Sequence, residues 1–283
     1  MAMPGTAPKI NVVIPCYNQG AFVEETIDSV LKSDFQDFEI VVVNDGSTDD
    51  KTNELLAGLK KPKTRVLKQA NQGPSAARNA GVRASASPYF LPLDADDTIE
   101  PSYLGKALAV LEAEPKLGFA YGDMRLFGDE NFVRRLPEYD LWRLLWDNQL
   151  PICALVRRAA WAAAGGYNPN MAGGFEDWDF WISLGEHGWY GRHIPETLFN
   201  YRRHGPTRDA GAMRRRRELR ARIRANHPAL YGDRARLREI RGVWRGTSVF
   251  FPAWIAVKEL ARANWFPPST RRKMRALVYR NKD

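Results

Sequence analysis

Residues 88–100 read Pro-Tyr-Phe-Leu-Pro-Leu-Asp-Ala-Asp-Asp-Thr-Ile-Glu, a short apolar run that ends abruptly in acids. The part from Tyr89 to Leu93 has the composition of a buried strand. Because burying an unpaired carboxylate is expensive, Asp94, Asp96 and Asp97 are expected at the end of that strand, in a crevice facing water, a cation or a ligand's donor groups. In open α/β sheets, ligands bind at the carboxyl ends of the strands. The stretch therefore predicts an α/β fold with a binding site at this edge.

The spacing of the acids suggests which of them share a site. Alternate side chains of an extended chain point to the same side, so the carboxylates of Asp94 and Asp96 can converge while Asp97 turns away. A few hard oxygen ligands suit Mg²⁺ or Mn²⁺ shared with a diphosphate. The alternative is an ordinary acidic turn, in which the residues from Thr98 to Pro101 begin the next helix. The stretch by itself leaves both interpretations open.

The residues before this stretch alternate between strand and helix patterns. Strands are predicted at 10–14, 38–43 and 65–68, and helices at 21–32, from about 48 to 59, and at 76–85. Their short connections favour right-handed βαβ units and a mostly parallel sheet. Polar residues also follow two of these strands, at Tyr17-Asn18 and Asp45-Gly46-Ser47. Since parallel strands end at one edge, these residues and the acids after residue 93 predict a nucleotide-sized crevice.

Two charged residues near this edge each allow a functional and a structural interpretation. Asp45 can accept a hydrogen bond from a base N–H or a ribose hydroxyl, or it can form an Asx-turn with Gly46 and Ser47. Arg78, in the predicted helix 76–85, can help to neutralise phosphates, or it can be a solvated helix residue. The sequence has no Gly-x-Gly-x-x-Gly motif and no Walker loop, so dinucleotide binding and ATP hydrolysis lose their main support.

The second half of the chain is less regular. Strands are predicted at 117–127, 131–136, 151–156, 190–193 and 197–201, and helices at 139–146, 157–164 and 175–187. A glycine-containing loop, 167–174, leads into Phe175-Glu176-Asp177-Trp178. A helix N-terminus favours an ionised carboxylate, so Asp177 is a candidate general base facing an acceptor hydroxyl. Alternatively, Glu176 and Asp177 only complement the helix dipole.

Composition limits the class of protein. The 283 residues are 44% hydrophobic and 27% charged, as in a soluble globular protein. Cys16 and Cys153 have no metal or redox spacing, so reduced thiols are expected. The N-terminus does not resemble a signal peptide, and no apolar run approaches the ~18 residues of a membrane span. A cytoplasmic location is therefore expected, with peripheral binding at the inner face of the membrane as a further possibility.

The net charge of +9 is distributed unevenly, because basic residues crowd the region after Arg202. Four consecutive arginines occupy 214–217, and helical patterns continue through Arg224, Arg241 and 261–280. The apolar stretch 249–257, with Trp244, Trp265 and Phe266, resembles an interfacial amphipathic element. These features favour an anionic membrane surface as a partner; packing on the rest of the chain or on a second subunit are the alternatives. Nucleic acid is disfavoured, since no recognition motif accompanies the charge.

Five motifs, in this order, resemble those of family 2 glycosyltransferases. They are Val12-Val13-Ile14-Pro15-Cys16-Tyr17-Asn18, Val42-Val43-Asn44-Asp45-Gly46-Ser47-Thr48-Asp49, Asn71-Gln72-Gly73-Pro74-Ser75-Ala76-Ala77-Arg78-Asn79, Leu93-Asp94-Ala95-Asp96-Asp97 and Gly174-Phe175-Glu176-Asp177-Trp178-Asp179. The resemblance covers about residues 9–204. It implies a GT-A fold, which is a Rossmann-like, mostly parallel sheet flanked by helices. The expected domains are a catalytic domain, 1–205, and a basic, aromatic-containing helical extension, 206–283.

The same resemblance implies an activity and a set of site residues. The enzyme would transfer a sugar from a nucleoside diphosphate donor, with UDP as the expected nucleotide, and would invert the configuration at the anomeric carbon. The acceptor would be a glycan or a lipid-linked molecule in polysaccharide biosynthesis. The enzyme would require Mn²⁺ or Mg²⁺. The residues implied are Pro15, Tyr17 and Asp45 at the base, Asn71 and Arg78 on the donor side, Asp94 and Asp96 for donor and metal, His204 for the metal or diphosphate, and Asp177 as the general base.

Two other function classes remain as alternatives. The basic C-terminal part would suit a scaffold on membrane surfaces with a degenerate catalytic domain, although the acids at 94, 96 and 177 are all present. A sugar nucleotidyltransferase would also use acids and a metal on an α/β sheet. It would be expected to have a Gly-rich triphosphate loop after the first strand, and Pro15 to Gly20 is not one. The sugar, the acceptor and the number of subunits stay open.

Overall fold

The computed structural model describes residues 7–205 and 208–243. These residues divide into two compact units: 7–139 with 149–231, and 140–148 with 232–243. The apolar stretch 249–257, the aromatic residues Trp244, Trp265 and Phe266, and the helix expected at 261–280 lie outside the described residues. The strands and the candidate site residues all belong to the first unit.

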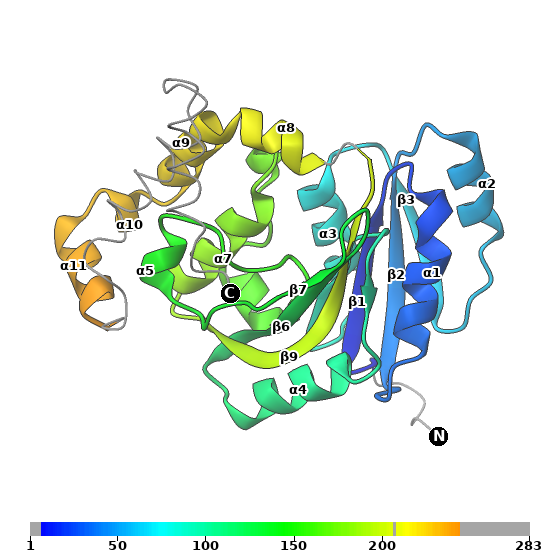
Figure 1. The fold of residues 1–283 in the computed structure, drawn as a ribbon, viewed down its shortest axis with the longest axis horizontal. Helices are drawn as coiled ribbons and strands as arrows, with labels where there is room; N and C mark the ends of the chain where they lie inside the picture. The colour runs from blue at the N-terminus through cyan, green and yellow to red at the C-terminus, as the bar shows by residue number, and fades with distance from the viewer. Residues whose placement is uncertain (1–6, 206–207, 244–283) are drawn as a thin grey trace. The chain divides into compact units, whose positions relative to one another are not determined.

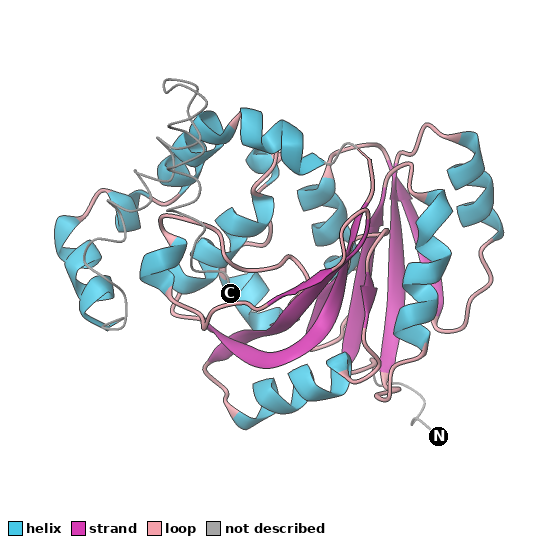
Figure 2. Cartoon of the chain, viewed as in Figure 1, coloured by secondary structure: helices cyan, strands magenta, loops and turns pink. Residues whose placement is uncertain are grey.

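The described part of the first unit contains one sheet of nine strands (Figures 1 and 2). Its strands are β1 (Ile10–Cys16), β2 (Phe38–Asp45), β3 (Thr64–Gln69), β4 (Tyr89–Pro92), β5 (Thr98–Ile99), β6 (Leu117–Gly128), β7 (Phe132–Arg134), β8 (Leu155–Arg157) and β9 (Tyr190–Arg203). The order is β3-β2-β1-β4-β8-β6-β9-β5, and β7 pairs with β6. The four strands β3, β2, β1 and β4 are parallel to one another, and β6 is parallel to β9. β5, β7 and β8 are antiparallel, so the sheet is mostly parallel, as predicted.

Helices flank the sheet in the βα order expected from the sequence. The first unit contains α1 (Gly20–Leu31), α2 (Asp50–Gly58), α3 (Pro74–Arg83), α4 (Tyr103–Ala113), α6 (Arg158–Ala163), the 3-10 turn η1 (Pro169–Met171) and α7 (Glu176–Glu186). α3 packs on β1 and β2, and α4 packs on β6, β8 and β9. The approach of α3 is close, because a Cβ on Gly81 would lie 2.3 Å from Val13 Cγ1.

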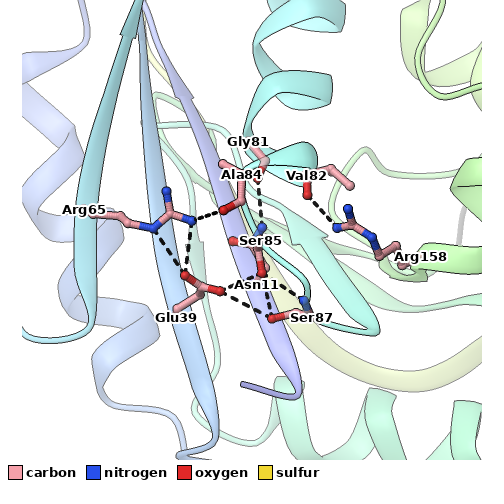
Figure 3. A network of polar contacts seen from close by, with 9 residues as sticks. All are labelled: Asn11, Glu39, Arg65, Gly81, Val82, Ala84, Ser85, Ser87 and Arg158. Carbon is pink, nitrogen blue, oxygen red and sulfur yellow. Dashed lines mark hydrogen bonds and ion pairs between the residues drawn. The ribbon is translucent and has the colours of Figure 1, made fainter. Parts of the chain in front are cut away.

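A polar network fixes the C-terminal end of α3 against the sheet (Figure 3). Asn11, the polar residue within β1, is buried and donates to the Gly81 carbonyl at 3.0 Å. Ser85 donates to Glu39 at 2.6 Å, and Arg158 donates to the carbonyl of Val82 at 2.6 Å. Satisfying these buried groups holds α3 in place. Arg78 lies on the same helix, so the network also fixes the position of the Arg78 backbone.

Two predictions about the strands were wrong, and one alternative that the sequence left open is excluded. The strands expected at 190–193 and 197–201 are one strand, β9, in which the register with β6 jumps from Ile194–Gly122 to Thr197–Asp123. Pro195 lies in that bulge, where its missing N–H breaks no ladder bond. Thr98 and Ile99 do not begin a helix but pair with Asn200 and Phe199. β8 begins at Leu155 rather than at residue 151.

The described residues after 207 are mainly helical. They form α8 (Arg208–Arg214), α9 (Arg216–Asn226) and α10 (Pro228–Tyr231) in the first unit, and α11 (Arg234–Val243) in the second. α9 buries Leu219 and Ile223. In the second unit α11 packs with α5 (Leu141–Leu144), near an edge-to-face pair of Trp142 and Trp146. Among the described helices none is long and apolar enough to cross a membrane.

Candidate functional site

The loops after β1 and β2 are joined by one asparagine. Asn18 has a left-handed backbone (φ 56°), and its Oδ1 accepts from the backbone N–H groups of Thr48 at 2.8 Å and Asp49 at 3.1 Å. Its own N–H donates to the Ser47 hydroxyl at 3.1 Å. The two polar strand ends therefore meet, as the sequence predicted. The neighbouring Tyr17 is 44% exposed and Pro15 is half-buried, so this edge offers an aromatic face to solvent.

Asp45 ties β2 to the loop before α3. The buried carboxylate accepts from Gln69 Nε2 at 2.7 Å and from the backbone N–H groups of Gln72 at 3.0 Å and Gly73 at 2.9 Å. The Asx-turn that was one of the two interpretations of Asp45 is made instead by Asn44, whose Oδ1 accepts from the Ser47 N–H at 2.9 Å. Asp45 therefore holds the 71–73 loop, which carries the exposed Asn71, beside the end of β2.

Arg78 lies between two acids from distant parts of the chain. Nη2 is 2.6 Å from Asp94 Oδ1 and Nη1 is 2.9 Å from Glu176 Oε1. The Arg78 side chain is 3% exposed, so its interpretation as a solvated helix residue was wrong. Burial alone would lower the pKa of Arg78, but the two carboxylates outweigh it and raise that pKa, so the guanidinium stays charged. Arg78 thereby joins the strand-end acids to the start of α7.

Asp96 forms a second pair at the same edge. Its Oδ2 lies 2.9 Å from Nε2 of His204, which immediately follows β9, and the His204 ring is 4.6 Å from that of Phe22. Burial and the nearby Asp94 raise the pKa of Asp96, while His204 opposes this change. Asp97 is fully buried, so the expectation that it faces water, a cation or a ligand was wrong. The chain is not extended here but turns at Ala95 and Asp96, where the Asp97 N–H donates to the Asp94 carbonyl at 3.1 Å. Burial raises the pKa of Asp97 well above its usual value.

The start of α7 separates its first two acids. Gly174 (φ 124°) and Phe175 (φ 60°) turn the chain into the helix with left-handed backbones. Glu176 is buried against Arg78, whereas Asp177 stays partly exposed and accepts the Trp178 N–H at 2.8 Å. Of the pair, Asp177 is therefore the more exposed acid. Sequence reasoning did not place Glu176 in the network with Arg78 and Asp94, because its partner lies 98 positions away.

The sequence model of Glycosyl transferase family 2 matches residues 11–165. The chain belongs to this family. The match includes the first four motifs and the residues Asp45, Arg78, Asp94 and Asp96. Asp177 and His204 lie beyond the matched range. Family membership is thus shown, and the match does not extend to Asp177 and His204.

Relatives of known name share this family over part of their length. Glycosyltransferase GlyA of Streptococcus pneumoniae is 30% identical over 201 residues, 66% of this chain and 28% of that protein. Chondroitin synthase of Pasteurella multocida is 26% identical over 204 residues, 70% of this chain and 21% of that protein. The match thus spans less than a third of either relative.

The fold is similar to a solved glycosyltransferase structure. The structure of S. aureus TarS residues 1–349 in complex with UDP-GlcNAc superposes with a TM-score of 0.68 at 20% sequence identity, covering 82% of this chain and 70% of that one. This likeness and the mostly parallel sheet establish the GT-A fold expected from the motifs. At this identity the comparison carries the fold alone.

The metal implied by the family can be tested against the side chains present. Among the described residues no cluster of three or more His, Cys, Asp or Glu is arranged to hold an ion. Asp96 and His204 form a pair of possible metal ligands near the end of β4. Magnesium and similar ions are commonly held by one or two protein ligands together with substrate phosphates and water. The pair therefore fits a cation that arrives with a diphosphate and does not fit a cation held by protein alone.

Proposed function

We propose that this family 2 enzyme transfers a sugar, with inversion, from a UDP-sugar to a hydroxyl group of a glycan or lipid-linked acceptor. The observation that carries the proposal is the bridge from Asp94 through Arg78 to Glu176. It links the acids at the end of β4 to the helix whose next residue is Asp177. A donor bound at the acids after β4 and an acceptor bound beside Asp177 would therefore face each other across one crevice.

The donor would be recognised at the strand ends. Pro15 and Tyr17 would line the base, Asp45 would accept from it, and Asn71 and Asp94 would contact the sugar or ribose. Asp96 and His204 would hold Mn²⁺ or Mg²⁺, which supplies positive charge to the diphosphate. Arg78 would act by keeping Asp94 in place, since both its outer nitrogens already bind carboxylates. The UDP-GlcNAc bound to the TarS structure supports the choice of nucleotide.

Asp177 would serve as the general base. It lies in the first turn of α7, where the helix dipole favours its ionised form. In the reaction it takes the proton of the acceptor hydroxyl as that oxygen attacks C1 of the sugar. The bond from C1 to the diphosphate breaks on the opposite face, and its electrons leave with the nucleotide. A single displacement needs no enzyme nucleophile, so the new bond has inverted configuration.

A glycan acceptor is supported by the printed activities of relatives such as the chondroitin synthase. The catalytic part is proposed to be residues 1–205 and the extension 206–283. Family membership sets aside the nucleotidyltransferase alternative. The intact acids Asp94, Asp96 and Asp177 argue against a degenerate scaffold.

The test is calorimetry of UDP binding with Mn²⁺, compared with UTP, with GDP and without metal. Wild-type protein is expected to prefer UDP and to need the metal, and Asp96→Ala is expected to abolish the metal-dependent part. Asp34→Ala, which removes an exposed acid in the loop after α1, serves as the control. Unchanged metal-dependent affinity in Asp96→Ala would remove Asp96 from the site, and equal affinity for GDP would remove the preference for uridine.

A further inference from the structure

Asp97 is the third acid of the strand-end motif, and no role has yet been assigned to it. Its side chain is fully buried. Oδ1 accepts the backbone N–H of Arg202, in β9, at 2.8 Å. Oδ2 has no hydrogen-bond partner among the described residues. Burying a carboxylate with one hydrogen bond is costly, so a benefit elsewhere in the site is expected to offset that cost.

Arg202 in turn binds the acid motif through its side chain. Its Nε donates to the backbone carbonyl of Asp96 at 2.7 Å, and Nη2 lies 2.6 Å from Glu25 Oε2 of α1. The guanidinium also packs over the Phe22 ring at 5.0 Å and the Phe127 ring at 4.3 Å. Asp97 therefore holds the main chain of Arg202, and Arg202 holds the main chain of Asp96.

This reciprocal pair controls the geometry of the Asp96–His204 contact. His204 follows Arg202 by two residues, just past the end of β9, and Asp96 immediately precedes Asp97. The β5–β9 pairing, Thr98 with Asn200 and Ile99 with Phe199, fixes the same two segments from the other side. A shift of one segment along the other would separate Asp96 Oδ2 from His204 Nε2, which are 2.9 Å apart.

We propose that Asp97 and Arg202 are positioning residues, which hold Asp96 and His204 together to receive the cation and the diphosphate. The inference rests on the proposed function, because it assigns these two residues to the donor site. In this assignment neither residue binds the donor directly. Arg202 is 14% exposed, and its Nε and Nη2 bind the Asp96 carbonyl and Glu25, so it acts through the backbone of Asp96.

The experiment compares Arg202→Met with Arg157→Met. Arg157 is a matched control, since it also binds main-chain carbonyls, those of Leu117 at 3.1 Å and Leu111 at 2.7 Å, but in a different part of the unit. UDP affinity is measured by calorimetry with and without Mn²⁺. Arg202→Met is expected to weaken UDP binding about tenfold with Mn²⁺ and hardly at all without it, the scale of a lost hydrogen bond to a charged group. Arg157→Met is expected to change neither affinity.

Conservative variants separate positioning from a general loss of stability. Asp97→Asn keeps an oxygen for the Arg202 N–H and is expected to retain metal-dependent UDP affinity, whereas Asp97→Ala is expected to lose it. Thermal unfolding of all four variants checks that they fold. If UDP affinity depends on Mn²⁺ in the wild-type protein and depends on it equally in Arg202→Met and Asp97→Ala, the positioning role alone is overturned. Absence of metal-dependent UDP binding in the wild-type protein would overturn the proposed function as well.

Discussion

The arginines of the crevice differ from those of α8 and α9. Arg78 and Arg202 are enclosed and bind carboxylates or carbonyls from other elements. Arg214, Arg217 and Arg224 are exposed along the two helices. Removing one partner of a buried pair leaves an uncompensated charge, whereas exposed ion pairs contribute little. The same residue type therefore organises carboxylates in one region and supplies a positive surface in the other.

The largest effect is expected at Arg78. Arg78→Met leaves Glu176 buried without its cation and Asp94 without its anchor, so unfolding should become easier by about 3–5 kcal/mol. Urea denaturation measures this, with Arg217→Met as the matched exposed control, which should change stability by less than about 0.5 kcal/mol. Equal losses in the two variants would erase the distinction between the two groups of arginines.

Asp177→Asn should leave the fold and donor binding intact but slow transfer by roughly 10²-fold, the scale of a lost general base. Its cost in stability should be about 0.5 kcal/mol from the helix dipole. Asp50→Asn removes an acid from the first turn of α2 and controls for that dipole loss. Single-turnover rates and UDP affinity are the measurements. Normal turnover in Asp177→Asn would move the base to another acid.

The sequence revealed features of the fold and the site that depend on neighbouring residues, and missed those that depend on contacts between distant positions. β1 and β2 follow from apolar runs. These features are local, so the sequence contains them. The continuity of β9 is different, because it arises from pairing with β6 through a bulge around Pro195, which no local pattern encodes.

The burial of Arg78 was likewise beyond local reasoning. On α3 its neighbours are small residues, which suit either a solvated or a packed arginine. Its environment is set by Glu176, 98 positions later, and by the glycine-rich turn that delivers α7 to this side. The family resemblance pointed to Arg78 as a site residue, but only the fold identified its partners.

His227, at the C-terminal end of α9, adds a pH-dependent contact between α9 and α7. It is 3% exposed, with Nδ1 2.6 Å from Glu186 Oε2 and Nε2 3.3 Å from Asp179 Oδ1. Burial lowers the pKa of His227, but the two carboxylates outweigh it, so the pKa is raised above its usual value. The stability it contributes is therefore fully present below the unfolded pKa of about 6.5 and is lost as pH rises through the folded pKa.

His227→Gln should accordingly lower the free energy of unfolding by about 1.5 kcal/mol at pH 6, the scale of a hydrogen bond to a charged group. The difference from wild type should shrink as pH rises through the folded pKa. Urea titrations at several pH values measure this, with His187→Gln at the end of α7 as a control. A difference that grows with pH would mean that His227 is neutral in the folded protein.

The smallest effect for each residue is expected from the exposed arginines, which we propose help to hold the protein at an anionic membrane surface. Each basic residue near such a surface contributes about 1 kcal/mol. Cutting the chain near Gly205 is a poor test, because α9 supplies the Asn226 contact to Asp179 of α7 at 2.6 Å. The sharper test is the triple variant Arg214→Gln, Arg217→Gln, Arg224→Gln in the full chain.

Co-sedimentation with vesicles, with and without anionic lipid and at low and high salt, compares the triple variant with wild type. Wild type should bind anionic vesicles at low salt, the variant should bind less, and its unfolding free energy should stay within about 0.5 kcal/mol for each substitution. Wild type that stays in the supernatant under these conditions would exclude the membrane role. Since α9 buries Leu219 and Ile223 while its Arg217 and Arg224 are exposed, packing within the unit and attraction to a bilayer use different faces of this helix and do not compete.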